Sequence, residues 1–226
     1  MCATLGIIGG LGVQATSYFY DILHSLQTVV VEQEYLDIIL YSKPSTPDRS
    51  AYISGRSGES PLNSLLNAAL TLESAGATCI AIPCVTSHMF YDDLAQSVSI
   101  PIINMLEETA CFVSERGYSK VGLLATDGTL KGRFFHTALE KSGIEVSEPS
   151  DDAQAALMNM IYNVKRGETV ALEALDAIAA EMLEKGVQSV VLGCTELSLI
   201  AKGGNNYVDA LDILARAALR EIMPTG

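Results

Sequence analysis

The chain reads Thr78-Cys79-Ile80-Ala81-Ile82-Pro83-Cys84 in its first half and Ser189-Val190-Val191-Leu192-Gly193-Cys194 in its second, and these two stretches decide the fold. Each is a short apolar run typical of a buried strand, and each ends in a cysteine that polar residues follow. In open α/β sheets, ligands bind outside the carboxyl ends of the strands. We therefore expect Cys84 and Cys194 to face one cleft, where two thiols could act on one substrate as acid and base.

The two halves correspond at a second place. The N-terminal sequence Leu5-Gly6-Ile7-Ile8-Gly9-Gly10-Leu11-Gly12 has a counterpart in Val121-Gly122-Leu123-Leu124-Ala125-Thr126-Asp127-Gly128. The step from Leu5 to Val121 is 116 residues, and the step from Cys84 to Cys194 is 110. Two motif pairs at nearly the same separation indicate an internal duplication with a pseudo-twofold axis, and the active site is expected near that axis.

Short apolar runs alternate with longer amphipathic stretches along the chain, which is the βαβ pattern of parallel sheets. Strands are expected at residues 5–8, 36–41, 78–82, 101–104, 120–125, 143–146 and 189–192. Helices are expected at residues 15–27, 61–74, 105–116, 133–141, 153–164, 169–185 and 208–222. The polar segment 41–60 carries prolines and glycines and is expected to be a long loop over the functional edge of the sheet.

This pattern predicts an α/β fold of two pseudo-symmetric lobes, each a parallel β-sheet flanked by helices, with the active site in the cleft between them. The N-terminal lobe is expected to comprise residues 1–103 and 206–226, so that the last helix returns to it. The C-terminal lobe is expected to comprise residues 104–205. A chain of 226 residues with 49% hydrophobic residues can supply cores for both.

Charge and cysteine content exclude several classes of protein. A formal net charge of −13, with only 14 Lys and Arg, argues against nucleic-acid binding, which needs a basic surface. No stretch approaches the roughly 20 uninterrupted apolar residues of a membrane span, and no basic leader precedes the first strand, so we expect a cytoplasmic protein without membrane contact. Five scattered cysteines indicate neither a disulfide framework nor a metal site.

Six motifs occur in an order that resembles the aspartate/glutamate racemase family, most closely the cofactor-independent aspartate racemases. The resemblance spans nearly the whole chain, and it is the joint order of the motifs that makes it specific. The motifs are Gly9-Gly10-Leu11-Gly12, Pro47-Asp48-Arg49, Pro83-Cys84-Val85-Thr86-Ser87-His88, Gly122-Leu123-Leu124-Ala125-Thr126 with Gly128-Thr129, Val164-Lys165, and Gly193-Cys194-Thr195-Glu196-Leu197.

The resemblance implies an amino-acid substrate, a homodimer, and a racemase that uses neither pyridoxal phosphate (PLP) nor a metal. It also implies a two-base mechanism, in which one cysteine thiolate removes the α-proton and the other thiol protonates the opposite face. The chemistry of thiols supports this division independently. A free thiol has a pKa near 8.5, so modest stabilisation yields a thiolate at Cys84 or Cys194 while the partner stays protonated.

The resemblance also assigns the substrate contacts. Arg49 and Lys165 match positions that hold the side-chain carboxylate of aspartate, which suits an acidic chain that needs a few placed cations. Glu196 is expected to orient Cys194 or to bind the substrate ammonium. The α-carboxylate and ammonium are assigned to Thr86, Thr126, Thr129 and Thr195 with nearby backbone amides, and Gly10 is added to the substrate-binding set.

One departure keeps alternatives open. Family members commonly carry Asn after the first cysteine, where this chain has Val85, so a hydrogen-bond donor to the substrate carboxylate is missing. A glutamate or broad-specificity racemase, or a racemase-like amino-acid binding protein without turnover, remains possible. Taken singly, each residue also has a simpler interpretation: a cysteine at a strand end is often a small buried hydrophobe, and Arg49 and Lys165 are solvated charges. His88 has three interpretations: it could assist Cys84, cap a helix or lie on the surface.

Overall fold

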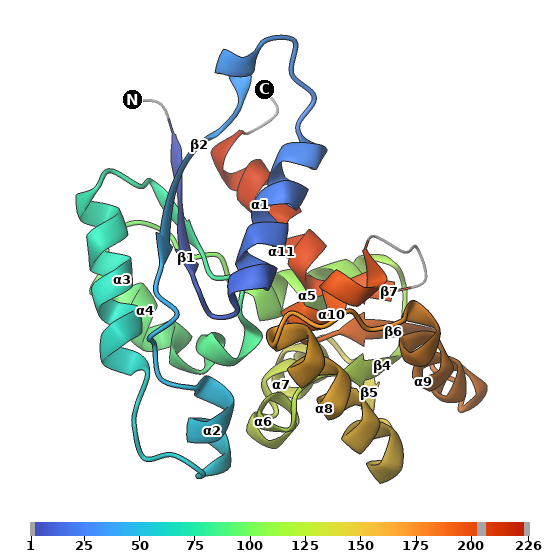
Figure 1. Ribbon diagram of the computed structural model, residues 1–226. Coiled ribbons are helices and arrows are strands. Elements are labelled where there is room, and N and C mark those ends of the chain that lie inside the picture. Colours follow the sequence, from blue (N-terminus) through green and yellow to red (C-terminus); the bar gives the residue numbers. More distant parts are fainter. Residues whose placement is uncertain (1–2, 203–206, 224–226) are drawn as a thin grey trace.

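The computed structural model describes residues 3–202 and 207–223 and contains two parallel β-sheets flanked by helices (Figure 1), which confirms the predicted fold class. The first sheet has the order β2-β1-β3 and the second the order β5-β4-β6-β7. The strands are β1 (Thr4–Gly9), β2 (Asp37–Ser42), β3 (Cys79–Ala81), β4 (Lys120–Leu124), β5 (Glu145–Ser147), β6 (Ser189–Leu192) and β7 (Tyr207–Asp209).

The helices cover these sheets and connect their strands. Those of the first half are α1 (Val13–Leu26), η1 (Glu32–Glu34), α2 (Arg49–Ser54), α3 (Leu62–Ser74), η2 (Val85–Phe90), α4 (Tyr91–Ser97) and α5 (Met105–Glu115), η denoting 3-10 helices. Those of the second half are α6 (Asp127–Gly132), α7 (Phe134–Lys141), α8 (Asp151–Lys165), α9 (Leu172–Glu184), α10 (Thr195–Ala201) and α11 (Ala210–Ile222).

The two sheets repeat one strand order, as the duplicated sequence motifs lead one to expect. In the first sheet β1 lies between β2 and β3, and a single bridge joins Ile80 of β3 to Ile102 beyond it. In the second sheet β4 lies between β5 and β6, and β7 lies beyond β6. All strand pairs are parallel, so the carboxyl ends of β3 and β6 leave their sheets at equivalent points.

The central strands are apolar because both of their faces are covered by helices. Leu5 and Ile7 of β1 and Val191 of β6 are fully buried, and β6 is buried along its whole length. The edge strand β2 is only partly covered. This burial pattern explains why periodicity and apolar content located the inner strands.

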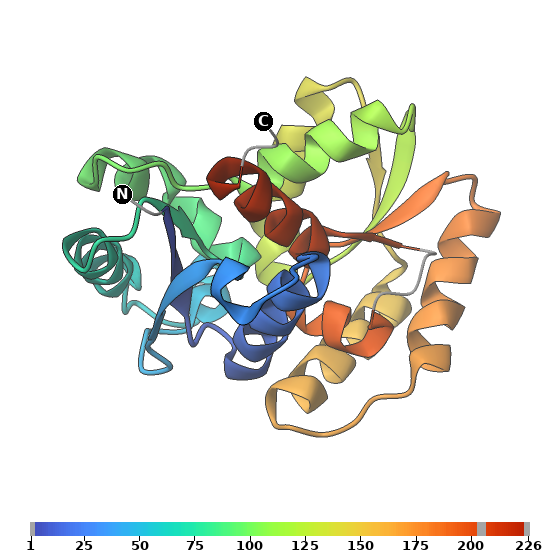
Figure 2. The ribbon, with the colours of Figure 1, turned by 90° about the horizontal axis from the view of Figure 1, so that it is seen from above.

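Helices α5 and α11 lie side by side where the two sheets meet (Figure 2). Helix α11, dark red, also packs against α1 and β3 of the first half, and α5 packs against α7 of the second half. The lobe boundary at residues 103–104 therefore precedes a helix that contacts both halves. The boundary at residues 205–206 lies outside the described residues, and the division into these two lobes remains a proposal.

Three expectations about secondary structure were wrong. The segment 41–60 contains helix α2, because Asp48 accepts a hydrogen bond from the Ala51 amide at its start and Gly55 ends it at φ +76°. Residues 101–104 form only one bridge instead of a strand. The helix expected from residue 208 begins at residue 210, because β7 precedes it and Asp209 caps it.

Candidate active site

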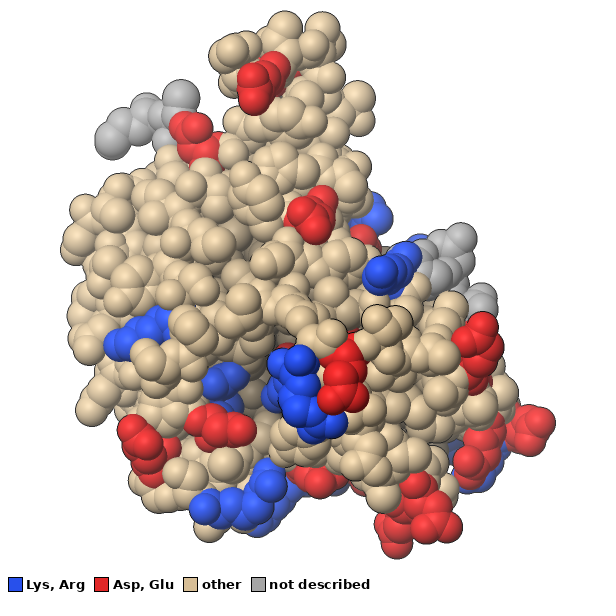
Figure 3. All heavy atoms as spheres, viewed as in Figure 1, with Lys and Arg blue, Asp and Glu red and all other residues tan. Residues whose placement is uncertain are grey.

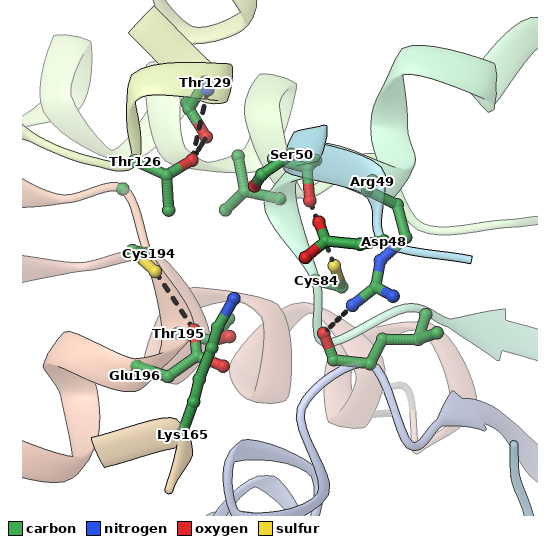
Figure 4. A pocket seen from close by; sticks show the side chains of 14 residues that line it. Asp48, Arg49, Ser50, Cys84, Thr126, Thr129, Lys165, Cys194, Thr195 and Glu196 are labelled. Atoms are coloured by element: carbon green, nitrogen blue, oxygen red, sulfur yellow. Dashed lines mark hydrogen bonds between the residues drawn. The ribbon is translucent and has the colours of Figure 1, made fainter. Parts of the chain in front are cut away.

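The two cysteines lie where β3 and β6 deliver them to one cavity. Cys84 follows β3 and precedes η2, and Cys194 follows β6 and precedes α10. Both have extended backbones and both are 5% exposed. Figure 4 shows the two sulfur atoms on opposite sides of the cavity. The strand ends thus bring together the two thiols that the sequence motifs paired.

Fourteen residues line this cavity, and nine of the ten predicted site residues are among them. Its volume of about 20 Å³ leaves room for the centres of only about one or two water molecules, so the cavity is narrow. The lining residues are Leu11, Asp48, Arg49, Ser50, Cys84, Val85, Thr86, Thr126, Thr129, Lys165, Gly193, Cys194, Thr195 and Glu196.

Gly10 is the predicted site residue that does not line this cavity. It lines an adjoining, more open hollow together with Gln14 and Arg166. Gly10 has φ +83°, and a Cβ atom there would lie 2.6 Å from the Lys43 amide nitrogen. The close approach of the loop 43–44 therefore explains this glycine, without any contact between Gly10 and the cavity.

The surroundings of Cys84 favour its thiolate. Burial alone would raise the pKa of the Cys84 thiol, but the positive charge of Arg49 and hydrogen bonding, including that of Thr86, outweigh burial and lower the pKa below its usual value. The Thr86 hydroxyl lies 3.4 Å from the Cys84 sulfur. Cys84 is therefore the better candidate for a resting base.

The surroundings of Cys194 favour its protonated thiol. Its sulfur donates a hydrogen bond to Glu196 Oε2 at 3.0 Å. Burial raises the pKa of Cys194 well above its usual value, the charge of Glu196 raises it further, and Lys165 opposes this only in part. The second oxygen of Glu196, Oε1, is buried without a hydrogen-bond partner among the described residues. The Cys194 thiol can thus act as a proton donor, and Oε1 of the neighbouring Glu196 can still accept a hydrogen bond.

The two predicted cations come from different halves of the chain. Lys165 is the last residue of α8, and much of it is exposed, but its side chain reaches the cavity in Figure 4. Burial opposes its charge, yet Glu196 and further acidic groups nearby, including Asp48, raise the pKa of Lys165. No hydrogen bond or ion pair to its ammonium group is found within residues 3–202 and 207–223. The ammonium is therefore available to an anionic ligand.

Arg49 is held by backbone carbonyls of the loops around it. Its guanidinium donates to the carbonyl oxygens of Leu11, Thr46 and Pro47. Its Nε is buried and lacks a partner among the described residues. Arg49 therefore has a structural role in holding these loops at the wall of the cavity, and it keeps one donor free beside Cys84.

The four predicted threonines are buried around the cavity. Thr126 caps α6 by accepting from the Thr129 amide at 3.2 Å, and the two hydroxyl groups lie 3.0 Å apart. Thr86 is beside Cys84, and Thr195 begins α10 directly after Cys194. These hydroxyls surround the cavity with groups that can donate or accept hydrogen bonds.

Sequence reasoning missed several lining residues, of which Asp48 and Ser50 are polar. Both belong to the start of α2, which lay in the segment predicted as a loop. The signal was present, because Asp48 follows Pro47 and precedes the apolar Ala51-Tyr52-Ile53, a pattern typical of a helix start. Leu11, Val85 and Gly193 lie in the quoted motifs but were not assigned to the site, although Val85 occupies the position where family members commonly carry Asn; all three are small or apolar walls of the cavity.

The charges on the molecular surface are unevenly distributed around this site. Figure 3 shows several Lys and Arg side chains near the middle of the face seen in Figure 1, where the two halves meet, within a surface that also carries many Asp and Glu.

In the part of the chain that the structure describes, no group of three or more His, Cys, Asp and Glu is placed to hold a metal ion. No described helix has the length and apolar character needed to span a membrane.

The sequence and structure of this chain are similar to those of known amino-acid racemases. The family model for Asp/Glu/hydantoin racemase matches residues 8–218. The broad specificity amino-acid racemase RacX of Bacillus subtilis is 26% identical over 216 residues, which cover 92% of each chain. The solved structure of Picrophilus torridus aspartate racemase is 28% identical with a TM-score of 0.87, and the match covers 97% of this chain and 94% of that one. An aspartate racemase homologue from Pyrococcus horikoshii is 29% identical with a TM-score of 0.78, over 97% and 98% of the two chains.

Proposed function

This chain belongs to the Asp/Glu/hydantoin racemase family, and on that premise we propose that it interconverts L- and D-aspartate without PLP. Cys84 and Cys194 act as the paired base and acid. The observation that carries this proposal is the placement of two buried thiols on opposite sides of one cavity, with the pKa of Cys84 lowered and that of Cys194 raised. Inversion needs one acceptor and one donor on opposite faces of the α-carbon, and this pair provides both.

In one direction the Cys84 thiolate takes the α-proton, and the electron pair of the C–H bond stays on the substrate as a carbanion. The Cys194 thiol then delivers its proton to the opposite face, which leaves a thiol at Cys84 and a thiolate at Cys194. The reverse reaction exchanges these roles. Donors around the narrow cavity, including the hydroxyls of Thr126 and Thr129, stabilise the negative charge that develops.

Aspartate suits the charges that remain free in the cavity. Lys165 offers an ammonium that has no hydrogen bond or ion pair among the described residues for the side-chain carboxylate, and Arg49 Nε offers a further donor. The free Glu196 Oε1 suits the substrate ammonium. A homodimer and a cytoplasmic location belong to the same proposal and rest on resemblance to the family; sedimentation analysis tests the first.

A broad-specificity racemase is the second candidate. RacX is similar over 92% of this chain, and Val85 gives the cavity an apolar wall directly after Cys84. Such an enzyme would turn over alanine, serine or glutamate at rates comparable to that for aspartate. Parallel assays on these amino acids separate the two candidates.

The test is solvent deuterium incorporation at the α-carbon of L-aspartate, followed by proton NMR and chiral chromatography with reductant and no added cofactor. We expect exchange together with D-aspartate. Cys84→Ala and Cys194→Ala should each lower racemisation on the order of 10²–10⁴-fold. Cys111→Ala is the matched control, because Cys111 is exposed and does not line the cavity.

Two results contradict the proposal. Substantial activity in either cysteine variant would remove the two-base mechanism. Calorimetric binding of aspartate without any α-proton exchange would indicate an amino-acid binding protein without turnover.

A further inference from the structure

His88 connects the first cysteine to a helix at the junction of the two sheets. It is 4% exposed, and its Nδ1 lies 3.0 Å from the carbonyl oxygen of Cys84. The Met105 amide donates to its Nε2 at 3.2 Å. A carbonyl can only accept and an amide N–H can only donate, so the ring is neutral and carries its proton on Nδ1. Burial lowers the pKa of His88, which favours the same neutral form.

The Met105 amide is the first N–H of α5 and has no partner within the helix. Asn104 accepts from the next two amides of this helix, and His88 satisfies the first. Because α5 packs against α7 and α11, it is held by elements of the second half. The backbone of Cys84 is therefore tied, through one imidazole, to a helix whose position depends on both halves. Tyr91 stacks parallel to this imidazole, with ring centroids 6.3 Å apart.

The second half contains a corresponding link with different chemistry. Ser198 stands four residues after Cys194, as His88 does after Cys84, and it is fully buried. Its hydroxyl donates to Asp209 Oδ1 at 2.7 Å, and the same oxygen accepts from the Leu211 amide at the start of α11. The Cys194 carbonyl, however, accepts from the Leu197 amide instead of from Ser198. Within the described residues, a side-chain link to a cysteine carbonyl therefore occurs at Cys84 and not at Cys194.

We propose that His88 is a positioning residue for the racemase reaction, which holds the Cys84 carbonyl on the first turn of α5 and so fixes the Cys84 thiol at the cavity. His88 does not line the cavity, so it acts through Cys84 and not on the substrate. The kinetic part of this inference rests on the proposed function. The position of the thiol can be measured without it, through the rate at which iodoacetamide alkylates Cys84 relative to Cys194, resolved by peptide mass spectrometry.

Three substitutions at one position separate the two hydrogen bonds. His88→Phe keeps an aromatic ring for Tyr91 and removes both bonds. His88→Asn retains an N–H near the place of Nδ1 and can still donate to the Cys84 carbonyl. His88→Gln can accept from the Met105 amide but has no donor near Nδ1. Ser198→Ala is the matched control, because it removes the corresponding link in the other half.

We expect His88→Phe to lower kcat for aspartate by about 10- to 100-fold with KM within about threefold, since misplacement of a reacting group by about 1 Å costs on this order. The same displacement of the Cys84 thiol should change the ratio of the Cys84 and Cys194 alkylation rates at least about fivefold. His88→Asn should recover most of both effects and His88→Gln should not. Ser198→Ala should leave the accessibility of Cys84 unchanged.

The inference is overturned if folded His88→Phe keeps the wild-type kcat and alkylation ratio, or if kcat falls while the ratio stays constant. It is also overturned if His88→Gln recovers the losses as well as His88→Asn, because the bond to Met105 alone would then matter. If His88→Phe does not fold, the kcat values and alkylation ratios of His88→Asn and His88→Gln are compared with each other, and equal values in these two variants overturn the inference. If the wild-type protein shows no racemisation, the proposed function fails, and the alkylation ratio still decides about His88.

Discussion

Gly12→Ala should impair the site while leaving the fold intact. A Cβ atom at residue 12 would lie 2.5 Å from Glu196 Oε1, and ordinary contact begins at 3.4 Å, so the carboxylate must move by 3.4 − 2.5 = 0.9 Å. The other oxygen of this carboxylate accepts the Cys194 thiol at 3.0 Å. A shift of this size weakens that hydrogen bond and disturbs the position of the proposed acid. We therefore expect kcat for racemisation to fall by about 10- to 100-fold.

The same substitution should cost little stability. Gly12 has φ −113° and ψ 143°, a conformation that any residue adopts, and the atom it meets is the end of a flexible side chain. We expect the Tm to change by less than about 4 °C, which corresponds to about 1 kcal/mol in a domain of this size. Gly58→Ala is the matched control, because a Cβ there meets nothing within 4 Å.

The assay is chiral chromatography of aspartate with a parallel thermal melt of each variant. If the effect passes through Glu196, adding Gly12→Ala to Glu196→Ala should cause no further loss, since the clash has gone. A kcat for Gly12→Ala within about twofold of Gly58→Ala would refute the reasoning, because 1 Å displacements of reacting groups cost far more than that. So would full additivity of the two substitutions.

Three further predictions follow from the site. Lys165→Leu should raise KM for aspartate at least about tenfold more than KM for alanine or serine. The reason is that a lost charged hydrogen bond, worth about 1.5–3 kcal/mol, matters only to a substrate with a side-chain carboxylate. Equal increases in KM for all three amino acids would show that Lys165 does not recognise the side chain of the substrate. The rate at which Cys84 is alkylated should rise with pH at a lower midpoint than the rate for Cys194. The thiolate is the reacting form, and the pKa of Cys84 is lowered while that of Cys194 is raised. If peptide mass spectrometry over a pH series gave the opposite order, the assignment of base and acid would be reversed. Gly10→Ala should lower the free energy of unfolding by at least about 1–2 kcal/mol in denaturant titrations, from the left-handed backbone alone. An unchanged midpoint would contradict the left-handed conformation of residue 10.

Much of this architecture could be predicted because it rests on repeated local patterns. The inner strands β1, β4 and β6 are continuous apolar runs, and the rule that ligands meet at carboxyl ends of parallel strands was enough to bring Cys84 and Cys194 together. The elements that were missed are short. Strand β7 has three residues, and α2 and α10 have six and seven, too few for a periodic signal.

What could not be predicted is the pairing of individual polar atoms. The sequence motif containing Glu196 left open whether it orients Cys194 or binds the substrate ammonium. The structure places one of its oxygens on the thiol and leaves the other free, so both roles stay compatible. His88 likewise had several readings, and only the three-dimensional approach of α5 supplies the Met105 amide that fixes its tautomer. The His88–Met105 pairing depends on packing that no local pattern encodes, whereas the Glu196–Cys194 pairing is between near neighbours whose side-chain orientation the sequence leaves open.

The duplicated fold carries an asymmetric distribution of charge, and this asymmetry constrains the proposed racemisation of aspartate. Arg49 favours a thiolate at Cys84, whereas burial and Glu196 favour a thiol at Cys194, so in the proposed mechanism the resting protein is prepared for one enantiomer. The other enantiomer needs the reverse protonation state. L- and D-aspartate have equal free energies in water, so kcat/KM must nevertheless be equal in the two directions. The asymmetry can therefore appear only as separate kcat and KM values whose ratio is the same, and the enantiomer that requires a thiolate at Cys194 meets the less populated form of the enzyme.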